Sequence, residues 1–358
     1  MIKKWYENGT LVLEENYKNG IKDGVRKEWY ANGILKEEGF YKSGRRDGLW
    51  KWWYGNGQLE REFSYKADER NGYAKWWHEN GQLKEVELYK ADRRVQEDSS
   101  ISWHANGNVA RKEICKAQKC VWKTWYDNGQ LEEIGCTKSG EYYGVSKYWH
   151  KNGKIGEIGE YKEGEKEGLW KEWYDNGRQA SLQIFKSGEL DGPYRSWHEN
   201  GKVEIVGNYK NGKEVGTWKK WHSNGRLKSV VRYIEGIEDG IFREWHENGK
   251  LKEYGLYDEG RKEGPWKSWY ENGKLKEEGF YSSNKKTQRW KYWHENGMLK
   301  EEGRYHLNRK NGCWKSWNAN GELESELCYD GEKELSKSEY VKMIKKKLEK
   351  NSAGMFRQ

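Results

Sequence analysis

Proline and aliphatic residues are scarce in this sequence. There are only two Pro among 358 residues, and Leu, Ile, Val and Phe together number 54, whereas charged residues make up 35%. So few aliphatic residues and so much charge are typical of disordered chains. The 23 Trp and 25 Tyr argue against disorder, because aromatic side chains bury large apolar areas. The sequence therefore predicts a protein that folds on aromatic residues.

Cysteine is also rare, and its number is odd. The five are Cys115, Cys120, Cys136, Cys313 and Cys328. They stand at scattered positions, which favours reduced thiols over a disulfide framework. A bond between Cys115 and Cys120 around a short loop is the alternative. The sequence has no 18-residue apolar run and no stretch typical of a signal peptide. We therefore expect a soluble, cytoplasmic protein.

A concentrated patch of one charge is missing over most of the chain. The net charge is +9, and six Lys with two Glu fall in residues 337–350. Elsewhere Lys and Glu are interleaved, whereas proteins that bind nucleic acid concentrate Lys and Arg on one face. We therefore expect no nucleic-acid partner.

A tandem repeat is what the sequence has in abundance. Asn-Gly pairs recur in one phase, 24 residues apart except for one step of 26 and one of 22. A fixed period of this length is typical of a stacked repeat array. The Gly residues of the fourteen phased pairs are Gly9, Gly33, Gly57, Gly81, Gly107, Gly129, Gly153, Gly177, Gly201, Gly225, Gly249, Gly273, Gly297 and Gly321.

Each repeat carries aromatic residues at fixed distances from its Asn-Gly pair. Trp lies four residues before the Gly, Tyr or His three before it in all but one repeat, and usually Tyr eight after it. Most of these rings are expected to form the core of a sheet that is poor in Leu and Ile. The others are expected to form a binding surface, because Trp and Tyr dominate binding hot spots. The candidate binding residues are Trp173, Trp197, Trp221, Trp245, Trp269, Trp293, Tyr209, Tyr233, Tyr257 and Tyr281.

The predicted fold class is all-β, an elongated antiparallel meander of about 14 tandem hairpins. Asn-Gly supplies the two positive φ angles that a two-residue type I′ turn requires. In the hairpin around Gly273, such a turn pairs Tyr270 with Leu275, Trp269 with Lys276, Lys267 with Glu278 and Trp266 with Gly279.

Trp266 is expected to cover the bare backbone of Gly279, as aromatic residues do for glycines in sheets. Counts do not establish this pairing as a rule of the repeat. Five of nine repeats with an aromatic residue at this position have Gly opposite, and two of the five others do.

No catalytic, cofactor or metal site is predicted. Equivalent His residues of successive repeats are two strands apart, roughly 9.6 Å, which is too far for two of them to ligate one zinc ion. The recurring Glu-Glu pairs point to opposite faces of a strand, so they cannot act together as acid and base. The His residues concerned are His78, His104, His150, His198, His222, His246 and His294.

The two ends differ from the array. We expect residues 1–331 to form the repeat array and residues 332–358 to form a basic amphipathic helix with a tail. The helix begins with a capping box at Ser336 and Glu339. It covers the last strand edge or, alternatively, binds a membrane surface or a partner. At the other end Met1 begins inside a repeat, which predicts an open strand edge that belongs to a truncated chain or takes a partner strand.

The repeat resembles the MORN-repeat variant of bacterial proteins, a group that includes YwqK-family antitoxins. Residues 260–270 and 164–174 carry the resemblance best, and it extends over residues 1–331. It implies an all-β row of hairpins and a binding role. The main hypothesis is a non-enzymatic scaffold that binds protein, with a toxin as the finer expectation. The alternatives are an array that binds cell-wall polysaccharide and a module associated with membranes.

Overall fold

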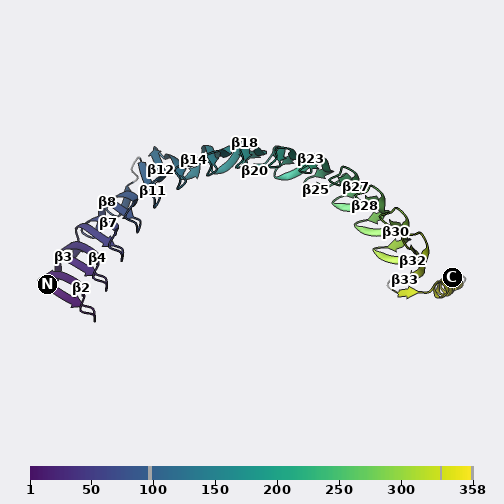
Figure 1. The fold of residues 1–358 in the computed structure, drawn as a ribbon, viewed down its shortest axis with the longest axis horizontal. Helices are drawn as coiled ribbons and strands as arrows, with labels where there is room; N and C mark the ends of the chain where they lie inside the picture. Colours follow the sequence, from purple (N-terminus) through teal and green to yellow (C-terminus); the bar gives the residue numbers. More distant parts are fainter. Residues whose placement is uncertain (96–98, 331–332, 356–358) are drawn as a thin grey trace. The chain divides into compact units, whose positions relative to one another are not determined.

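The computed structural model describes residues 1–95, 99–330 and 333–355. These residues form 34 strands and one helix, so the predicted all-β meander of hairpin repeats is confirmed. The chain divides into two units. Unit 1 is Met1–Glu167 with Trp173–Gly177, and unit 2 is Gly168–Glu172 with Arg178–Gln358. Within each unit, strands that follow one another in the sequence pair antiparallel (Figure 1).

The strands of unit 1 are β1 Ile2–Trp5, β2 Leu11–Lys18, β3 Ile21–Trp29, β4 Leu35–Lys42, β5 Arg45–Arg46, β6 Gly48–Trp53, β7 Leu59–Lys66, β8 Glu69–Trp77, β9 Leu83–Lys90, β10 Arg93–Val95, β11 Ser99–Trp103, β12 Val109–Lys116, β13 Lys119–Trp125, β14 Leu131–Lys138, β15 Glu141–Tyr142, β16 Gly144–Trp149 and β17 Ile155–Lys162. Residues of β18, Glu165–Trp173, belong to both units.

The elements of unit 2 are β19 Gln179–Lys186, β20 Glu189–Leu190, β21 Gly192–Trp197, β22 Val203–Lys210, β23 Lys213–Trp221, β24 Leu227–Ile234, β25 Ile237–Glu238, β26 Gly240–Trp245, β27 Leu251–Asp258, β28 Arg261–Trp269, β29 Leu275–Ser282, β30 Lys285–Trp293, β31 Leu299–His306, β32 Arg309–Trp317, β33 Leu323–Asp330, β34 Lys333–Leu335 and the helix α1 Lys337–Met355.

The Asn-Gly turns are three-residue loops, so the predicted two-residue turn is wrong. The Gly273 amide donates to the Tyr270 carbonyl at 2.8 Å, and the Tyr270 amide donates to the Lys274 carbonyl at 2.9 Å. Gly273 has a φ of 88°, but Asn272 has no positive φ. A type I turn followed by a left-handed glycine has this geometry. Its extra residue changes the pairing next to the turn.

A second irregularity between Ser268 and Trp269 restores the register further along the hairpin. The predicted pairs Lys267–Glu278 and Trp266–Gly279 are therefore confirmed. The pairs Tyr270–Leu275 and Trp269–Lys276 are wrong, because Trp269 lies opposite Leu275 instead.

The two-residue turns with two positive φ angles are found in the second loops that the structure describes, from residues 19–20 to residues 307–308. Asn19 and Gly20 have φ of 51° and 77°, and their flanking residues Lys18 and Ile21 pair directly. Some of these turns have no glycine, as at Leu307 and Asn308, with φ of 48° and 70°. The positive φ angles are thus adopted even by side chains that disfavour them, because the surrounding strands fix the turn.

Most buried Trp lie over a glycine of the preceding strand, not over their partner in the same hairpin. Trp122 is an exception, because it lies over its own partner Gly135. Trp266 pairs with Gly279, yet a Cβ on Gly279 would overlap the indole of Trp290. Trp266 in turn covers Gly255. The expectation that Trp covers glycine is correct, but the predicted partner is wrong. Seven repeats have Trp at this position, and six of those have Gly eleven residues earlier: Gly39, Gly159, Gly207, Gly255, Gly279 and Gly303.

A bulge places such a Trp over the glycine of the preceding strand. The pairing of β29 with β30 is irregular between Glu278 and Phe280, opposite the segment that contains Gln288. Gln288 has a φ of 60°, whereas the equivalent residues Gly264 and Gly312 have φ of 71° and 74°. The bulge residue is therefore in the left-handed region, which favours glycine.

Replacing Gln288 by glycine is expected to stabilise the protein by about 0.5–1 kcal/mol, because it relieves a left-handed side-chain conformation. The reciprocal change, Gly264→Ala, should destabilise by about 1 kcal/mol through φ alone, since a Cβ at Gly264 has no atom within 4 Å. Urea midpoints of the two variants and the wild type test this pair. A higher midpoint for Gly264→Ala would contradict it.

A lysine side chain lies over the indole ring of several buried Trp and shields it from water. Lys286 Nζ lies 3.9 Å from the centre of the Trp290 ring and is paired with Glu277 at 3.3 Å. Lys262 repeats this arrangement over Trp266 at 4.0 Å, with Glu253 at 2.9 Å. The ion pair lies over a ring that is otherwise wrapped by tyrosines, so the aromatic core of a single sheet is shielded from water.

The helix α1 packs beside the last strands of unit 2. The predicted capping box is present: Ser336 Oγ accepts from the Glu339 amide at 3.3 Å, and Glu339 Oε2 accepts from the Ser336 amide at 2.9 Å. Lys337 reaches Glu326 at 2.9 Å, and Lys347 reaches Asp330 at 3.0 Å. Both acidic residues belong to β33, which favours the interpretation that the helix covers the strand edge. Residues 331–332 at the predicted boundary and 356–358 in the predicted tail lie outside the described residues.

Four of the five cysteines form disulfides, so the prediction of reduced thiols is wrong for them. Cys115 is bonded to Cys120, and Cys313 to Cys328. Both pairs are direct cross-strand partners, which places their sulfur atoms next to each other. Scattered substitutions in sequence thus become neighbours through strand pairing. Cys136 is a free thiol.

Candidate interaction surface

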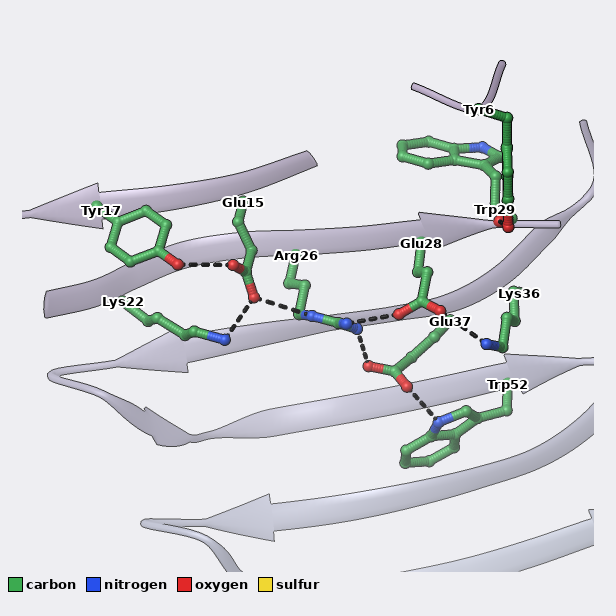
Figure 2. A network of polar contacts seen from close by, with 10 residues as sticks. All are labelled: Tyr6, Glu15, Tyr17, Lys22, Arg26, Glu28, Trp29, Lys36, Glu37 and Trp52. Carbon is green, nitrogen blue, oxygen red and sulfur yellow. Dashed lines mark hydrogen bonds and ion pairs between the residues drawn. The ribbon is translucent and has the colours of Figure 1, made fainter. Parts of the chain in front are cut away.

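The Tyr or His next to each Asn-Gly turn connects one repeat to the next. Its side chain donates to the carbonyl oxygen of the Trp of the following repeat, as Tyr6 Oη does to Trp29 at 2.9 Å (Figure 2). His246 Nε2 lies 2.9 Å from the Trp269 carbonyl, and Tyr270 Oη lies 2.7 Å from that of Trp293. Both side chains place a donor at the same distance from the backbone. Tyr and His are therefore interchangeable here, with the histidine proton on Nε2.

The Asn of the pair makes a second connection between repeats. Asn248 Nδ2 donates to the Glu271 carbonyl at 2.6 Å, and Asn248 Oδ1 accepts from the Lys250 amide at 2.9 Å. The asparagine therefore bridges neighbouring turns, and the left-handed conformation is left to the glycine. The sequence period indicated that this asparagine has a structural role in the turn, but it did not indicate a hydrogen bond to the next repeat.

The His246→Phe variant should lose about 1 kcal/mol of stability, because the Trp269 carbonyl loses its donor. The matched variant, His246→Tyr, should keep the wild-type stability, since the tyrosine hydroxyl occupies the same place in the repeat of Tyr270. Chemical denaturation followed by Trp fluorescence measures both. Equal stability of the Phe and Tyr variants would contradict the assignment.

The candidate Trp residues lie at the turn ends of their strands and are half-buried. Their carbonyl groups accept the connections just described, as in Trp221, Trp245 and Trp269. The irregularity beside each of them interrupts the alternation of side chains, so the simple assignment of these Trp to one face of the sheet does not apply.

The candidate Tyr residues belong to the aromatic core. The Tyr209 ring lies 4.9 Å from that of Trp218, and the Tyr281 ring lies 5.1 Å from that of Trp290. Burial, with nearby carboxylates as a smaller cause, raises the pKa of Tyr257 and Tyr281 to about 12. These tyrosines act mainly as packing groups, so the structure separates the candidate Tyr from the candidate Trp instead of gathering them in one patch.

Exposed apolar side chains gather on the sheet face opposite the buried Trp, which we call the mixed face. In unit 2 it carries the cross-strand pairs Ile241–Leu256 and Pro265–Phe280. Ile241 is 47% exposed and Phe280 is 39% exposed. In unit 1 the equivalent exposed residues are Val25, Phe40, Leu49, Tyr73, Val121 and Val145. Their alternation with the buried Trp was a signal in the sequence that the search for Trp and Tyr missed.

The mixed face also carries ion pairs beside the apolar row. Lys267 pairs with Glu278 at 3.0 Å, as the sequence predicts. A pocket of about 340 Å³ is lined by these two residues together with Pro265, Phe280 and Arg289 among others. The surface thus has exposed apolar side chains flanked by charged ones.

In the first repeats an ion network replaces the buried Trp and its glycine. Arg26 stands at the position of Trp290, and Glu15 at that of Gly279. Figure 2 shows Arg26 between three carboxylates. Arg26 Nε donates to Glu15 Oε1 at 2.9 Å, and the guanidinium also pairs with Glu37. Glu15 is only 5% exposed.

The remaining partners satisfy this network. Lys22 Nζ and Tyr17 Oη each donate to Glu15 at 2.7 Å. Burial alone would raise the pKa of Glu15, but the hydrogen bonds from Lys22 and Tyr17 and the charges of Lys22 and Arg26 lower it overall. The Glu15 carboxylate is therefore held ionised inside the sheet.

A metal-binding role for the histidines finds no support in the geometry. Over the described ranges, the one group of His, Cys, Asp or Glu close enough to share an ion is Glu113, Cys115 and Cys120. Among the described residues, no helical segment has both the length and the hydropathy of a membrane span.

Comparison with known proteins identifies one family. The family described as MORN repeat variant matches residues 2–19, 22–43, 46–67, 70–91, 121–139, 190–211, 238–259, 262–283, 289–306 and 310–330. A search of curated proteins finds no match.

Two solved structures show the level of similarity to known folds. The crystal structure of TcdB2-TccC3 without its hypervariable C-terminal region is 12% identical, with a TM-score of 0.17 over 90% of this chain and 20% of that one. A Tc holotoxin pore of Photorhabdus luminescens is 11% identical, with a TM-score of 0.17 over 91% and 20%. The present chain thus spans about a fifth of those chains. Similarity this low says nothing about function.

Proposed function

Because the chain belongs to the MORN repeat variant family, we propose that it is a non-catalytic scaffold that binds a protein partner along its repeats. The observation that supports this most is the mixed face, where exposed apolar side chains recur beside Lys–Glu pairs. Exposed apolar rows rimmed by charge are typical of interaction sites. Repetition gives a partner several equivalent contacts, each contributing part of the binding energy.

The finer proposal is that the partner is a toxin, which the scaffold neutralises by binding in the cytoplasm. It rests on the resemblance of the repeat to the group that includes YwqK-family antitoxins. Disulfides persist mainly in oxidising compartments, so the cysteine pairs remove one argument for the cytoplasm. Alkylation of thiols in freshly lysed host cells tests the location: full labelling of Cys313 and Cys328 would support the cytoplasm, and protection would oppose it.

Capture of a partner from the native host tests the main proposal. The immobilised full chain should retain one protein in fixed ratio, and light scattering after size exclusion should show a complex of defined mass. Glycan arrays and liposome sedimentation form parallel arms, the latter with and without residues 333–358. Binding to a glycan or to liposomes, with no protein in fixed ratio, would reject the protein scaffold.

The structure favours neither alternative. The rings that a polysaccharide would need are mostly packed in the core, as for Tyr257 against Trp266. Two lysines of the helix, Lys337 and Lys347, are engaged with β33, which reduces the charge available to a membrane surface.

A further inference from the structure

The hairpin of β12 and β13 holds three ligand-type side chains next to one another. Cys115 and Cys120 are direct cross-strand partners around a tight turn, and Glu113 lies two residues before Cys115 on the same face of the strand. The carboxylate and both sulfur atoms lie within 4.8 Å of one another. Cys120 is 8% exposed, and the other two residues are half-buried. The proposed scaffold function uses none of these groups.

We propose that this hairpin, when Cys115 and Cys120 are reduced, binds one Zn²⁺ through the two thiolates and the Glu113 carboxylate. Zinc takes sulfur at about 2.3 Å and carboxylate oxygen at about 2.0–2.2 Å in a tetrahedral arrangement. Ligand atoms of one tetrahedral ion then lie roughly 3.5–3.8 Å apart. Once the bond between the two sulfur atoms is reduced, they are free to separate to that spacing, and the fourth position is left for water.

Oxidation of the two thiols to a disulfide removes the metal site. Reduction of the Cys115–Cys120 bond by an external thiol reductant takes up two electrons and two protons and gives two thiols. Zinc binding then releases both thiol protons to solvent as the thiolates ligate the ion. The disulfide form offers a single carboxylate, so it holds no ion. The same two cysteines thus alternate between a covalent cross-link and a metal clip.

Neighbouring charge limits the affinity of the site. Arg111 lies 3.4 Å from Glu113 and stacks 4.8 Å from the centre of the Trp122 ring. Its guanidinium pairs with the carboxylate and therefore competes with a metal cation for it. Removal of this competitor, as in Arg111→Gln, should therefore tighten zinc binding several-fold, whereas a site made of the two sulfurs alone would be unaffected.

The chain contains an internal control. Cys313 and Cys328 form the equivalent cross-strand pair of β32 and β33. Among the residues that the structure describes, no carboxylate or imidazole completes a ligand group with them. This second pair is reducible in the same way but lacks the third ligand.

Titration of the reduced full chain with Zn²⁺ and Co²⁺ tests the proposal. Calorimetry should give one tight ion per chain, and Co²⁺ should produce a thiolate-to-metal charge-transfer absorption. We expect Cys115→Ser to abolish tight binding, Glu113→Gln to weaken it at least tenfold, and Cys313→Ser to leave it unchanged. Circular dichroism confirms that each variant is folded. Equal binding by the oxidised chain or by Glu113→Gln, or no tight binding by the reduced chain, would overturn the site.

Discussion

Replacing Trp290 by alanine is expected to lower the free energy of unfolding by about 3–5 kcal/mol, the usual cost of emptying the site of a fully buried aromatic residue. Trp290 is 0% exposed and lies between the rings of Tyr281 and Tyr305, with Gly279 beneath it and Lys286 above it. Its removal opens a cavity that these neighbours cannot close. Urea unfolding of the full chain, with amide exchange in β29–β31, measures the effect.

A second variant tests the same contact between Trp290 and Gly279 by changing the glycine. A valine at Gly279 would place its Cβ inside the Trp290 ring, so Gly279→Val should destabilise by about 1–3 kcal/mol or more. Combining it with Trp290→Ala should give less than the sum of the two losses, because the alanine frees the space that the valine needs. Strict additivity would show that the two residues do not form one packing unit.

Removing Arg26 should have an effect of similar size in unit 1. Arg26→Met leaves Glu15 buried with its nearest guanidinium gone, and breaking one partner of a buried ion pair costs about 3–5 kcal/mol. Glu15, Glu28 and Glu37 all contact the guanidinium, so three carboxylates lose a counter-charge, and Glu15 keeps only Lys22. Urea unfolding with amide exchange in β2–β4 measures the loss.

The double variant Glu15→Gly/Arg26→Trp should restore most of this stability. It installs in the first repeats the pair that Gly279 and Trp290 form further along the chain, and buried ion pairs are often replaced by apolar packing at no net cost. The single variant Arg26→Trp, which leaves Glu15 beneath the indole, should remain destabilised. A double variant no more stable than Arg26→Met would contradict the equivalence of the two arrangements.

The same network makes unit 1 sensitive to acid. The folded-state pKa of Glu15 is lowered, so its contribution is fully present above the ordinary value of 4.5 and is lost as the pH falls through the lowered value. In the double variant this carboxylate is absent. The stability of β2–β4 should therefore fall less steeply between about pH 5 and pH 2 in the double variant than in the wild type, as amide exchange would show.

The architecture could be predicted from the sequence because the same hairpin pattern recurs in every repeat. Few architectures other than a row of hairpins fit the pattern of the repeat. The Asn-Gly pairs are in phase, Trp lies four residues before each Gly, and the intervals between turns have the length of strands. The inner register, such as Lys267 opposite Glu278, was predicted from a two-residue turn and is correct because the irregularity beside Trp269 restores it. The turn type did not follow, because Asn-Gly suits both the type I′ turn and the type I turn closed by a left-handed glycine.

Contacts between neighbouring hairpins were harder to predict than contacts within one. The pairing of Trp290 with Gly279 depends on a bulge that alternation does not show. The eleven-residue spacing was nevertheless present in the sequence, and a search across repeats would have found it. The binding surface was sought among Trp and Tyr, which the sheet uses largely as core. Exposed residues such as Ile241 alternate with the buried ring positions, and this alternation identifies a second apolar face only once the buried face is known.

The claim that the mixed face binds the partner is tested most directly by the affinity of the recovered partner for one double variant. The test variant, Ile241→Ser/Phe280→Ser, removes two exposed apolar side chains of that face. The control variant, Met298→Ser/Leu323→Ser, removes two apolar side chains that are 49% and 56% exposed and lie outside the mixed-face pairs. Calorimetry should show binding at least tenfold weaker, about 1.4 kcal/mol, for the first variant and unchanged for the second. Wild-type affinity in the Ile241→Ser/Phe280→Ser protein would contradict the account.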